Sequence, residues 1–581
     1  EIEMDKKTKI VCTMGPSTDT LEMVESLLRA GMNVARFNFS HGTHEEQAKR
    51  MELVRLASDR TGIPVALMLD TKGPEIRLGL FKDGKVCLEE GQAFTLTTRD
   101  VEGTKEICSV NHAGLPEDVK EAKQILLSDG LVTLRIDSIE GTEIHTTVMN
   151  TGMMSNRKRV AVPGVSLSLP PVSEQDEKDL LFGCEMGVDY VAASFMQRAS
   201  DVVAIRRILE SKGADIRIIS KIENEEGLNN LDAILEVSDG LMVARGDLGV
   251  EIPAEEVPVL QKMMIQKCNA ASKPVITATQ MLESMVSNPR PTRAEASDVA
   301  NAILDGTDAV MLSGETAGGD YPLEAVSTMA RIAKVTETSA LYVNSNHTVP
   351  LAEAKTTDAI CSATVEVGRS LAAGAIITCT ESGITAMSIS RHRPNCPIIA
   401  VTPHESALRR MQLYWGVTAI QGPSHSNSDE MVHCAMSAAL GEGLIQSGDL
   451  VVVTAGVPSG LSGTTNMIRV HVTGNVLIKG RGVGKLSVTG PIHHGDSPEP
   501  MADGSILVVR DLEPEYMELA KRAGAIVTAE EGYTSTAAIA GIQFGIPVIL
   551  GAHDQSKLTN GQVVTVDGIR GNVYEGIANA R

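Results

Sequence analysis

The chain has 581 residues, 43% hydrophobic and 22% charged, a composition that indicates a folded globular protein and excludes a disordered or fibrous one. Its formal net charge of −22 argues against nucleic acid or an anionic membrane as the main partner. No apolar run reaches the ~18 residues of a membrane span, and the first residues lack a signal-peptide core. Nine cysteines occur without CxxC pairs, so we expect free thiols and a cytoplasmic protein.

Strand-like and helix-like segments alternate in two stretches, residues 1–70 and residues 172–342. Apolar strand patterns lie at 9–13, 32–40, 64–70, 189–195, 216–221, 240–245, 274–279 and 308–313. Strands that alternate with helices build a parallel sheet with the helices outside. Eight such strands predict an α/β fold, a (β/α)8 TIM barrel.

Three further regions interrupt or follow the barrel. Residues 71–171 carry short alternating runs between Gly and Asp turns, which predict an inserted small β barrel that ends at Pro170 and Pro171. A polar linker near 343–350 leads to residues 351–473, whose buried strand patterns indicate an α/β domain. Residues 474–581 read as a separate β/α domain.

Polar and charged residues follow the predicted barrel strands, and the carboxyl ends of parallel strands meet on one face of such a barrel. We therefore expect one cluster of Arg36, Asn38, Ser40, Asp70, Thr71, Arg77, Lys221, Glu223, Gly246, Asp247 and Thr279. Carboxylates on neighbouring strands suit Mg²⁺ or Mn²⁺, and the cations suit a phosphoryl group. Taken singly, any charged residue of this set could form a structural ion pair instead; Lys221 and Glu223, for instance, could simply precede a helix capped by Asn224.

Several blocks resemble the pyruvate kinase family, and they occur in the family's order. They are NFSHG (38–42), LDTKGPEIR (69–77), IRIISKIENEEGL (216–228), ARGDLG (244–249), TATQMLESM (277–285) and MLSGETAGGDYP (311–322). The resemblance extends to about residue 473. It implies an enzyme of glycolysis that moves the phosphoryl group of phosphoenolpyruvate to ADP, giving ATP and pyruvate, and that assembles as a homotetramer.

The resemblance also implies roles for matched residues. Catalytic roles fall to Lys221, Arg36, Arg77 and Thr279, and substrate contacts to Arg36, Lys221, Gly246, Asp247 and Thr279. Nucleotide contacts fall to Asn38, His41, Arg77 and Lys158, the last brought in when the inserted domain closes as a lid. Mg²⁺ or Mn²⁺ is held by Glu223 and Asp247, and K⁺ by Asn38, Ser40, Asp70 and Thr71. Glu75 stands where K⁺-independent members carry lysine, so we expect K⁺ dependence.

Residues 351–473 resemble the family's regulatory domain. The segment TESGITA (380–386) has the hydroxyl-rich make-up of a phosphate nest, so we expect a phosphorylated effector at Thr380, Ser382, Gly383 and Thr385. The segment GVPSGLSGTTNMIR (456–469) resembles the loop that closes over that effector. Two Gly/Ser surface loops are the plainer alternative.

Residues 474–581 resemble the swivelling phosphohistidine domain of phosphoenolpyruvate-utilising enzymes. Its motif, usually TSHAA, reads Thr534, Ser535, Thr536, Ala537 and Ala538 here. A hydroxyl of ordinary pKa cannot act as a reversible phosphoryl carrier in place of imidazole. We therefore expect a domain that serves packing or subunit contacts, and we expect the pair His493 and His494 to lie at the surface.

Two other functions compete with the kinase. A barrel aldolase of oxo acids would use the same metal and enolate for carbon–carbon chemistry, and a catalytically inactive sensor would only bind phosphoenolpyruvate or an effector. The ADP-directed cations Arg77 and Lys158 disfavour the aldolase, and intact Lys221, Glu223 and Asp247 disfavour the sensor.

Overall fold

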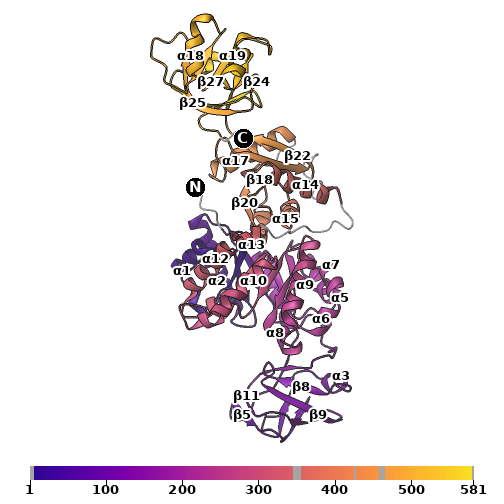
Figure 1. Ribbon diagram of the computed structural model, residues 1–581. Coiled ribbons are helices and arrows are strands. Elements are labelled where there is room, and N and C mark those ends of the chain that lie inside the picture. Colours follow the sequence, from indigo (N-terminus) through magenta and orange to yellow (C-terminus); the bar gives the residue numbers. More distant parts are fainter. Residues whose placement is uncertain (1–5, 344–354, 424–426, 457–464, 579–581) are drawn as a thin grey trace. The chain divides into compact units, whose positions relative to one another are not determined.

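The computed structural model describes residues 6–343, 355–423, 427–456 and 465–578, which fall into two compact units. The first unit contains the chain up to residue 351 together with residues 406–416. Its centre is a closed barrel in the order β1-β17-β16-β15-β14-β13-β3-β2, with every pairing parallel (Figure 1). The barrel strands are β1 (Lys9–Thr13), β2 (Val34–Asn38), β3 (Ala66–Asp70), β13 (Tyr190–Ala193), β14 (Arg217–Ile222), β15 (Gly240–Ala244), β16 (Val275–Ala278) and β17 (Ala309–Leu312). The predicted barrel is confirmed, with three strands before the insertion and five after it.

Helices surround the barrel and cover its outer face. They include α1 (Leu21–Ala30), α2 (His44–Thr61), α4 (Glu174–Met186), α5 (Ala199–Ser211), α7 (Leu231–Val237), α9 (Val257–Ala270), α10 (Arg293–Leu304) and α12 (Pro322–Glu337). Capping boxes start two of them: the side chain of Thr43 accepts from the Glu46 N–H, and that of Thr292 from the Glu295 N–H. Because both faces of the strands are covered, their residues are apolar almost throughout, which explains the continuous hydrophobic runs in the sequence.

The segment 406–416 closes the end of the barrel where the strands begin. It carries the end of α16 (Glu405–Arg410) and the short helix η3 (Met411–Leu413). The Tyr190 hydroxyl donates to the Arg410 carbonyl at 2.7 Å, and Arg409 Nε donates to Asp189 Oδ1 at 2.9 Å. Leu413 is buried in the same cluster as the side chains that fill the barrel. The opposite end, where the strands finish, is therefore the end at which polar residues can gather.

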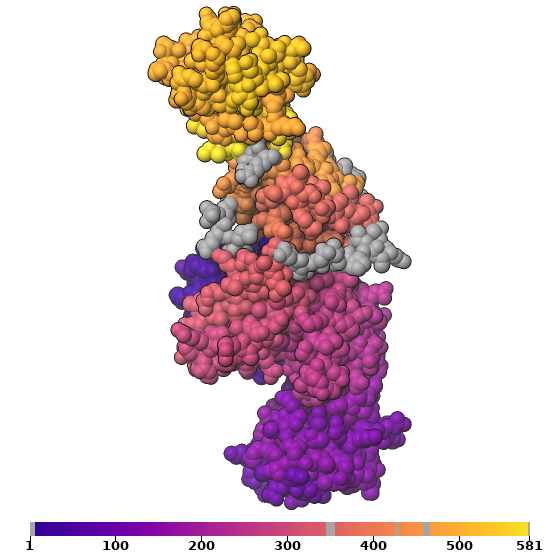
Figure 2. All heavy atoms as spheres, in the orientation of Figure 1, coloured from indigo at the N-terminus to yellow at the C-terminus, as the bar shows by residue number. Residues whose placement is uncertain are grey.

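The inserted region, residues 71–171, is called the lid below and has its own core. A seven-stranded sheet in the order β4-β12-β8-β9-β10-β6-β7 and a two-stranded sheet, β11-β5, surround buried Phe94, Leu96 and Ile144. The strands are β4 (Ile76–Arg77), β5 (Lys85–Leu88), β6 (Ala93–Thr97), β7 (Ile107–Ser109), β8 (Gln124–Leu127), β9 (Val132–Glu140), β10 (Glu143–Val148), β11 (Gly152–Ser155) and β12 (Arg159–Ala161). In the space-filling view the lid forms a violet lobe of its own (Figure 2).

The second unit holds residues 352–405 and 417–581. Its first part is a five-stranded sheet in the order β20-β19-β18-β21-β22, parallel except at β22. Its elements are α14 (Thr356–Ser370), β18 (Ala375–Cys379), α15 (Ile384–Ser390), β19 (Ile398–Thr402), β20 (Val417–Gln421), α17 (Ser428–Gly441), β21 (Leu450–Gly456) and β22 (Thr465–Val472). Residues 457–464 of the expected effector loop, and most of the linker expected near 343–350, lie outside the described residues.

The last part of the chain is an eight-stranded sheet in the order β23-β30-β29-β25-β26-β27-β28-β24. Its elements are β23 (Val476–Lys479), β24 (Arg481–Val483), β25 (Ser487–His494), β26 (Ile506–Val509), α18 (Met517–Arg522), β27 (Ala525–Thr528), α19 (Thr536–Phe544), β28 (Val548–Leu550), β29 (Val563–Asp567) and β30 (Asn572–Glu575). The expectation of a surface histidine pair is wrong for His493, which is buried because β25 continues through it and pairs with β26. Over the described ranges, no helix combines the length and apolarity needed to cross a membrane.

Candidate active site

The ends of the barrel strands bring the expected polar residues onto one rim. Asn38, the last residue of β2, lies in register with Asp70, the last residue of β3. Lys221 lies near the end of β14, in register with Met242 of β15. The strand β15 runs directly into α8 (Arg245–Glu251), so Asp247 occupies the first turn of a helix that starts at the rim. Groups from four strands therefore meet, although Asn38 and Asp247 are 209 residues apart in sequence.

Lys221 is a buried cation of this rim. Its Nζ lies 3.1 Å from Asp70 Oδ1 and 3.2 Å from Glu223 Oε1, and it donates to Ser194 Oγ at 2.9 Å. Burial alone would lower the pKa of this ammonium, but the charges of Asp70 and Glu223 outweigh burial and raise it above its ordinary value. Lys221 is therefore a permanent positive charge at neutral pH and not a proton donor poised near pH 7.

Arg36 provides a second buried cation next to Lys221. Its Nε donates to Asp70 Oδ2 at 2.6 Å, and its NH1 donates to Thr13 Oγ1 at 2.8 Å. Asp70 thus accepts from Arg36 through one oxygen and from Lys221 through the other. Burial opposes the ionisation of Asp70, yet the two cations hold its pKa below the usual range. Arg36, Asp70, Lys221 and Glu223 therefore form a row of groups whose charges alternate in sign.

Glu223 and Asp247 are the paired carboxylates of the rim. Glu223 is buried, and its Oε2 accepts from the Phe195 N–H at 2.6 Å. Burial raises the pKa of Glu223 to about 7, and the nearby Asp247 charge adds to this, while Lys221 opposes it. Asp247 is 35% exposed, and its Oδ1 accepts from Arg159 NH1 at 2.5 Å.

This carboxylate pair suits a magnesium or manganese ion. Among the described residues no group of three or more His, Cys, Asp or Glu side chains could hold a metal. Two carboxylates with no third protein ligand leave positions for substrate oxygens and water, as Mg²⁺ sites at phosphates do. A cation bound between Glu223 and Asp247 would also relieve the carboxylate repulsion that helps to raise the pKa of Glu223.

The expected K⁺ ligands are neighbours, held in place by backbone hydrogen bonds. Asn38 Oδ1 accepts from the Ser40 N–H at 3.1 Å. Ser194 contacts the other two expected ligands, Asp70 and Thr71. Its N–H donates to Thr71 Oγ1 at 3.1 Å, and its hydroxyl contacts Asp70 Oδ1 at 3.2 Å. His41, expected to contact the nucleotide, is exposed on the same loop.

Thr279 holds the start of α8 against the end of β16. Its hydroxyl accepts from the Gly246 N–H at 2.7 Å and donates to the Ala278 carbonyl at 2.6 Å. Its φ of 69° lies in the left-handed region, which a β-branched residue rarely adopts. Thr279 therefore has a strained backbone and also accepts a hydrogen bond from Gly246. Both residues were expected to contact the substrate.

The two expected lid cations have different environments. Lys158 is exposed. Arg77 is held by Glu75, whose Oε2 accepts from its NH2 at 2.5 Å and from its Nε at 2.9 Å. Arg77 lies directly opposite Arg159 in the β4–β12 pair. The neighbouring strands β4 and β12 thus bring several cations together on one edge of the lid.

Two residues of the site, one after a barrel strand and one in the lid, were missed by sequence reasoning. Ser194 directly follows β13 and contacts Lys221, Asp70 and Thr71, so its place after a barrel strand was a usable signal. Arg159 adjoins Lys158 in the NRKRV run, yet it is buried and contacts Asp247. Only the fold could reveal that contact, because 88 residues separate the two.

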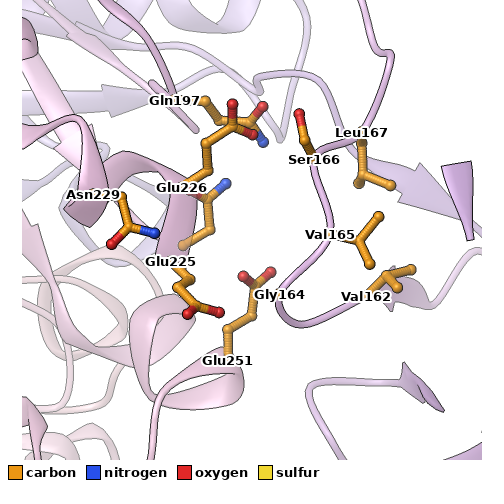
Figure 3. Close-up of a pocket in the computed structure, with 11 residues that line it drawn as sticks. Val162, Gly164, Val165, Ser166, Leu167, Gln197, Glu225, Glu226, Asn229 and Glu251 are labelled. Carbon is orange, nitrogen blue, oxygen red and sulfur yellow. The ribbon is translucent and has the colours of Figure 1, made fainter. Parts of the chain in front are cut away.

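A pocket of about 280 Å³ lies where the lid returns to the barrel. Figure 3 shows Glu225, Glu226 and Glu251 of the barrel on one side and the lid's exit segment, 162–167, on the other. Burial raises the pKa of Glu251 to about 7, while Arg159 opposes that rise. The junction between lid and barrel is therefore open and acidic beside Asp247.

The expected effector segment forms a tight turn in the second unit. The Gly383 N–H donates to Thr380 Oγ1 at 3.0 Å, and φ at Gly383 is 89°, a conformation that favours glycine. Thr385 Oγ1 lies 2.6 Å from Thr465 Oγ1, next to the undescribed loop. In the last domain, exposed Thr536 starts α19 directly after the cap residue Ser535.

A closed parallel barrel with buried cations and paired carboxylates at its strand ends defines a barrel enzyme that acts on an anionic substrate. Residues 5–326 match the family model of the pyruvate kinase barrel domain, and residues 358–471 match that of its alpha/beta domain. Residues 501–571 match the mobile domain of PEP-utilising enzymes.

Curated relatives match over nearly the whole chain. The pyruvate kinase of Geobacillus stearothermophilus is 50% identical over 586 residues, covering 99% of this chain and 100% of its own. That of Bacillus licheniformis is 49% identical over 588 residues, with the same coverage. The chain therefore belongs to the pyruvate kinase family and is a phosphotransferase. As expected, the pyruvate kinase models end near residue 473 and a model of the PEP-utilising mobile domain follows; these relatives match through that last domain as well.

Proposed function

We propose that the chain transfers the phosphoryl group of phosphoenolpyruvate to ADP, giving ATP and pyruvate, and that it requires Mg²⁺ (or Mn²⁺) and K⁺. The observation that carries this proposal is the buried ammonium of Lys221 between Asp70 and Glu223, with Arg36 on the same aspartate. Two fixed cations next to a pair of metal-type carboxylates are the groups that phosphoryl transfer needs.

The residues of the rim have separate tasks in this reaction. Arg36 and Lys221 stabilise the charge on the phosphoryl group as it passes through a loose, in-line transition state. A divalent cation held by Glu223 and Asp247 would supply further charge neutralisation on the substrate oxygens. The substrate carboxylate is assigned to the start of α8, where the Gly246 N–H now donates to Thr279.

Protonation of the enolate is assigned to the side on which Thr279 lies. Lys221 is a poor donor because its neighbours raise its pKa above the ordinary value. A water chain through the Thr279 hydroxyl is the proposed route. The proton that reaches the methylene carbon is then supplied by solvent and completes pyruvate.

The monovalent cation is assigned to Asn38, Ser40, Asp70 and Thr71. These residues offer neutral oxygens and one carboxylate, which suits a singly charged ion better than Mg²⁺. Glu75 supports K⁺ dependence, because the family's K⁺-independent members carry lysine there. ADP is assigned to Asn38, His41, Arg77 and Lys158, which brings the lid into the reaction.

The remaining domains are assigned regulatory and structural roles. A phosphorylated metabolite would bind at Thr380, Ser382, Gly383 and Thr385, where the turn at Gly383 supports a phosphate nest. We assign residues 1–70 and 172–342 to catalysis, 71–171 to the lid, 351–473 to regulation and 474–581 to a domain that is not a phosphoryl carrier. A cytoplasmic homotetramer is the proposed form, and the free cysteines support a reducing compartment.

The test is formation of pyruvate and ATP from phosphoenolpyruvate and ADP, with Mg²⁺ present or chelated and with K⁺ or an equal concentration of a tetraalkylammonium salt. The expected result is activity only when both cations are present. Activity without K⁺ would contradict the K⁺ assignment alone. Absence of activity together with intact phosphoenolpyruvate binding would favour the sensor, and carbon–carbon cleavage of an oxo acid would favour the aldolase.

A further inference from the structure

Arg159 of the lid contacts the barrel at the proposed metal site. It begins β12, directly after Lys158, and its side chain is only 10% exposed. Its NH1 donates to Asp247 Oδ1 at 2.5 Å, and its guanidinium lies 4.8 Å from the centre of the Phe195 ring. Phe195 is the residue whose N–H donates to Glu223. One lid side chain therefore contacts one proposed metal ligand and the residue that supports the other.

The charges around Arg159 are unbalanced. Besides Asp247, its guanidinium faces Glu251 at 3.9 Å and Asp129 at 4.0 Å. The buried guanidinium acts as a local counter-ion for Asp247 and Glu251, because carboxylates that are poorly screened by water repel one another, whereas Asp129 is exposed. A divalent cation at Asp247 would also neutralise this carboxylate charge. The two positive groups would repel each other across one carboxylate.

The exit segment of the lid faces Glu225, Glu226 and Glu251 across the open pocket (Figure 3). A second contact, from Arg198 NH2 to Ser166 Oγ at 2.7 Å, is made by an exposed side chain. Arg159 thus makes an enclosed ionic contact between lid and barrel.

We propose that Arg159 is a positioning residue that competes with the divalent cation for Asp247 and couples metal binding to release of the lid. Without the cation, Arg159 ties β12 to Asp247. When the cation binds, the Arg159 contact weakens and the lid is free to carry Lys158 and Arg77 to the nucleotide. This inference rests on the proposed metal site at Glu223 and Asp247.

The test measures Mn²⁺ binding to the full chain without substrates, by the electron paramagnetic resonance signal of free Mn²⁺. Arg159→Gln should bind Mn²⁺ about tenfold more tightly, since it removes one charge-assisted competitor. Arg135→Gln is the matched control: it removes another lid arginine, which pairs with Asp137 and Thr147 inside the lid. Its Mn²⁺ affinity should stay within about twofold of that of the unaltered chain.

Arg159→Lys separates charge from packing. It keeps the positive charge, so its Mn²⁺ affinity should return to within about threefold of the unaltered chain. Equal tightening in Arg159→Lys and Arg159→Gln would overturn the competition, because charge would then not be the cause. Unchanged or weaker Mn²⁺ binding in Arg159→Gln would overturn it as well.

Asp247→Asn distinguishes the two levels of the proposal. It should lose most of the Mn²⁺ affinity, because a metal ligand has been neutralised. If Asp247→Asn binds Mn²⁺ normally, the metal site itself is wrong and the role of Arg159 falls with it. If Asp247→Asn loses Mn²⁺ while Arg159→Gln does not gain affinity, only the competition is overturned.

Discussion

The barrel rim can be compared with the tip of the last domain, which we define as Ser535 and Thr536. Both lie in regions that match families of proteins that handle phosphoenolpyruvate, but they differ in the reactive groups that they carry. At the rim, Lys221 and Arg36 are buried and held by carboxylates. At the tip, the expected histidine position holds the exposed hydroxyl of Thr536. The last domain therefore forms its sheet and helices without a histidine at this position, because core packing and chemistry depend on different residues.

The largest expected effect is at the rim. Lys221→Met should lower kcat by about 10³ to 10⁵, the range for removal of a transition-state cation. The measurement is steady-state kcat with saturating phosphoenolpyruvate, ADP, Mg²⁺ and K⁺. Lys212→Met, which alters an exposed lysine at the end of α5, is the control and should be nearly silent. A loss smaller than about tenfold in Lys221→Met would remove Lys221 from this role.

We expect an intermediate effect, on stability alone, when a carboxylate near the tip is removed. Glu530 Oε1 accepts from the Leu512 N–H at 2.6 Å, and its Oε2 accepts from the Ala537 N–H at 3.0 Å. Glu530→Ala leaves both donors without this partner, so it should destabilise the last domain by about 1–3 kcal/mol. Hydrogen exchange of the β27 amides measures this change.

Glu531→Ala is the control for that experiment, because Glu531 is exposed and its side chain contacts exposed His553 at 3.1 Å. It should change the exchange free energy by less than about 0.5 kcal/mol. A fall in kcat as large as that of Lys221→Met in the Glu530→Ala variant would contradict the contrast between rim and tip.

The smallest effect is expected at the tip itself. Thr536→Ala should leave kcat within about twofold, since a surface hydroxyl outside the reaction is removed. Incubation with ³²P-labelled phosphoenolpyruvate should leave no label on the unaltered chain after rapid denaturation. Label that persists, and that Thr536→Ala abolishes, would show that the domain still carries phosphoryl groups.

Much of this site was predictable because its residues follow strands whose pattern is visible in the chain. Lys221 and Asp70 each come at the end of an apolar run, and in a parallel barrel all such ends meet. Ser194 obeys the same rule and was overlooked. The burial of His493 was missed because a histidine at a Gly-rich segment gives no sign that its strand continues.

By itself, the sequence determined the fold class, the order of the barrel strands and the chemical types gathered on the rim, because hydrophobic periodicity and strand ends are local properties of a chain. Only the tertiary structure decided that Arg159 reaches Asp247, that Arg77 is held by Glu75, and that Thr279 is strained against Gly246. Such contacts depend on distances and dihedral angles that are set when distant segments pack together, and no spacing in the sequence encodes them.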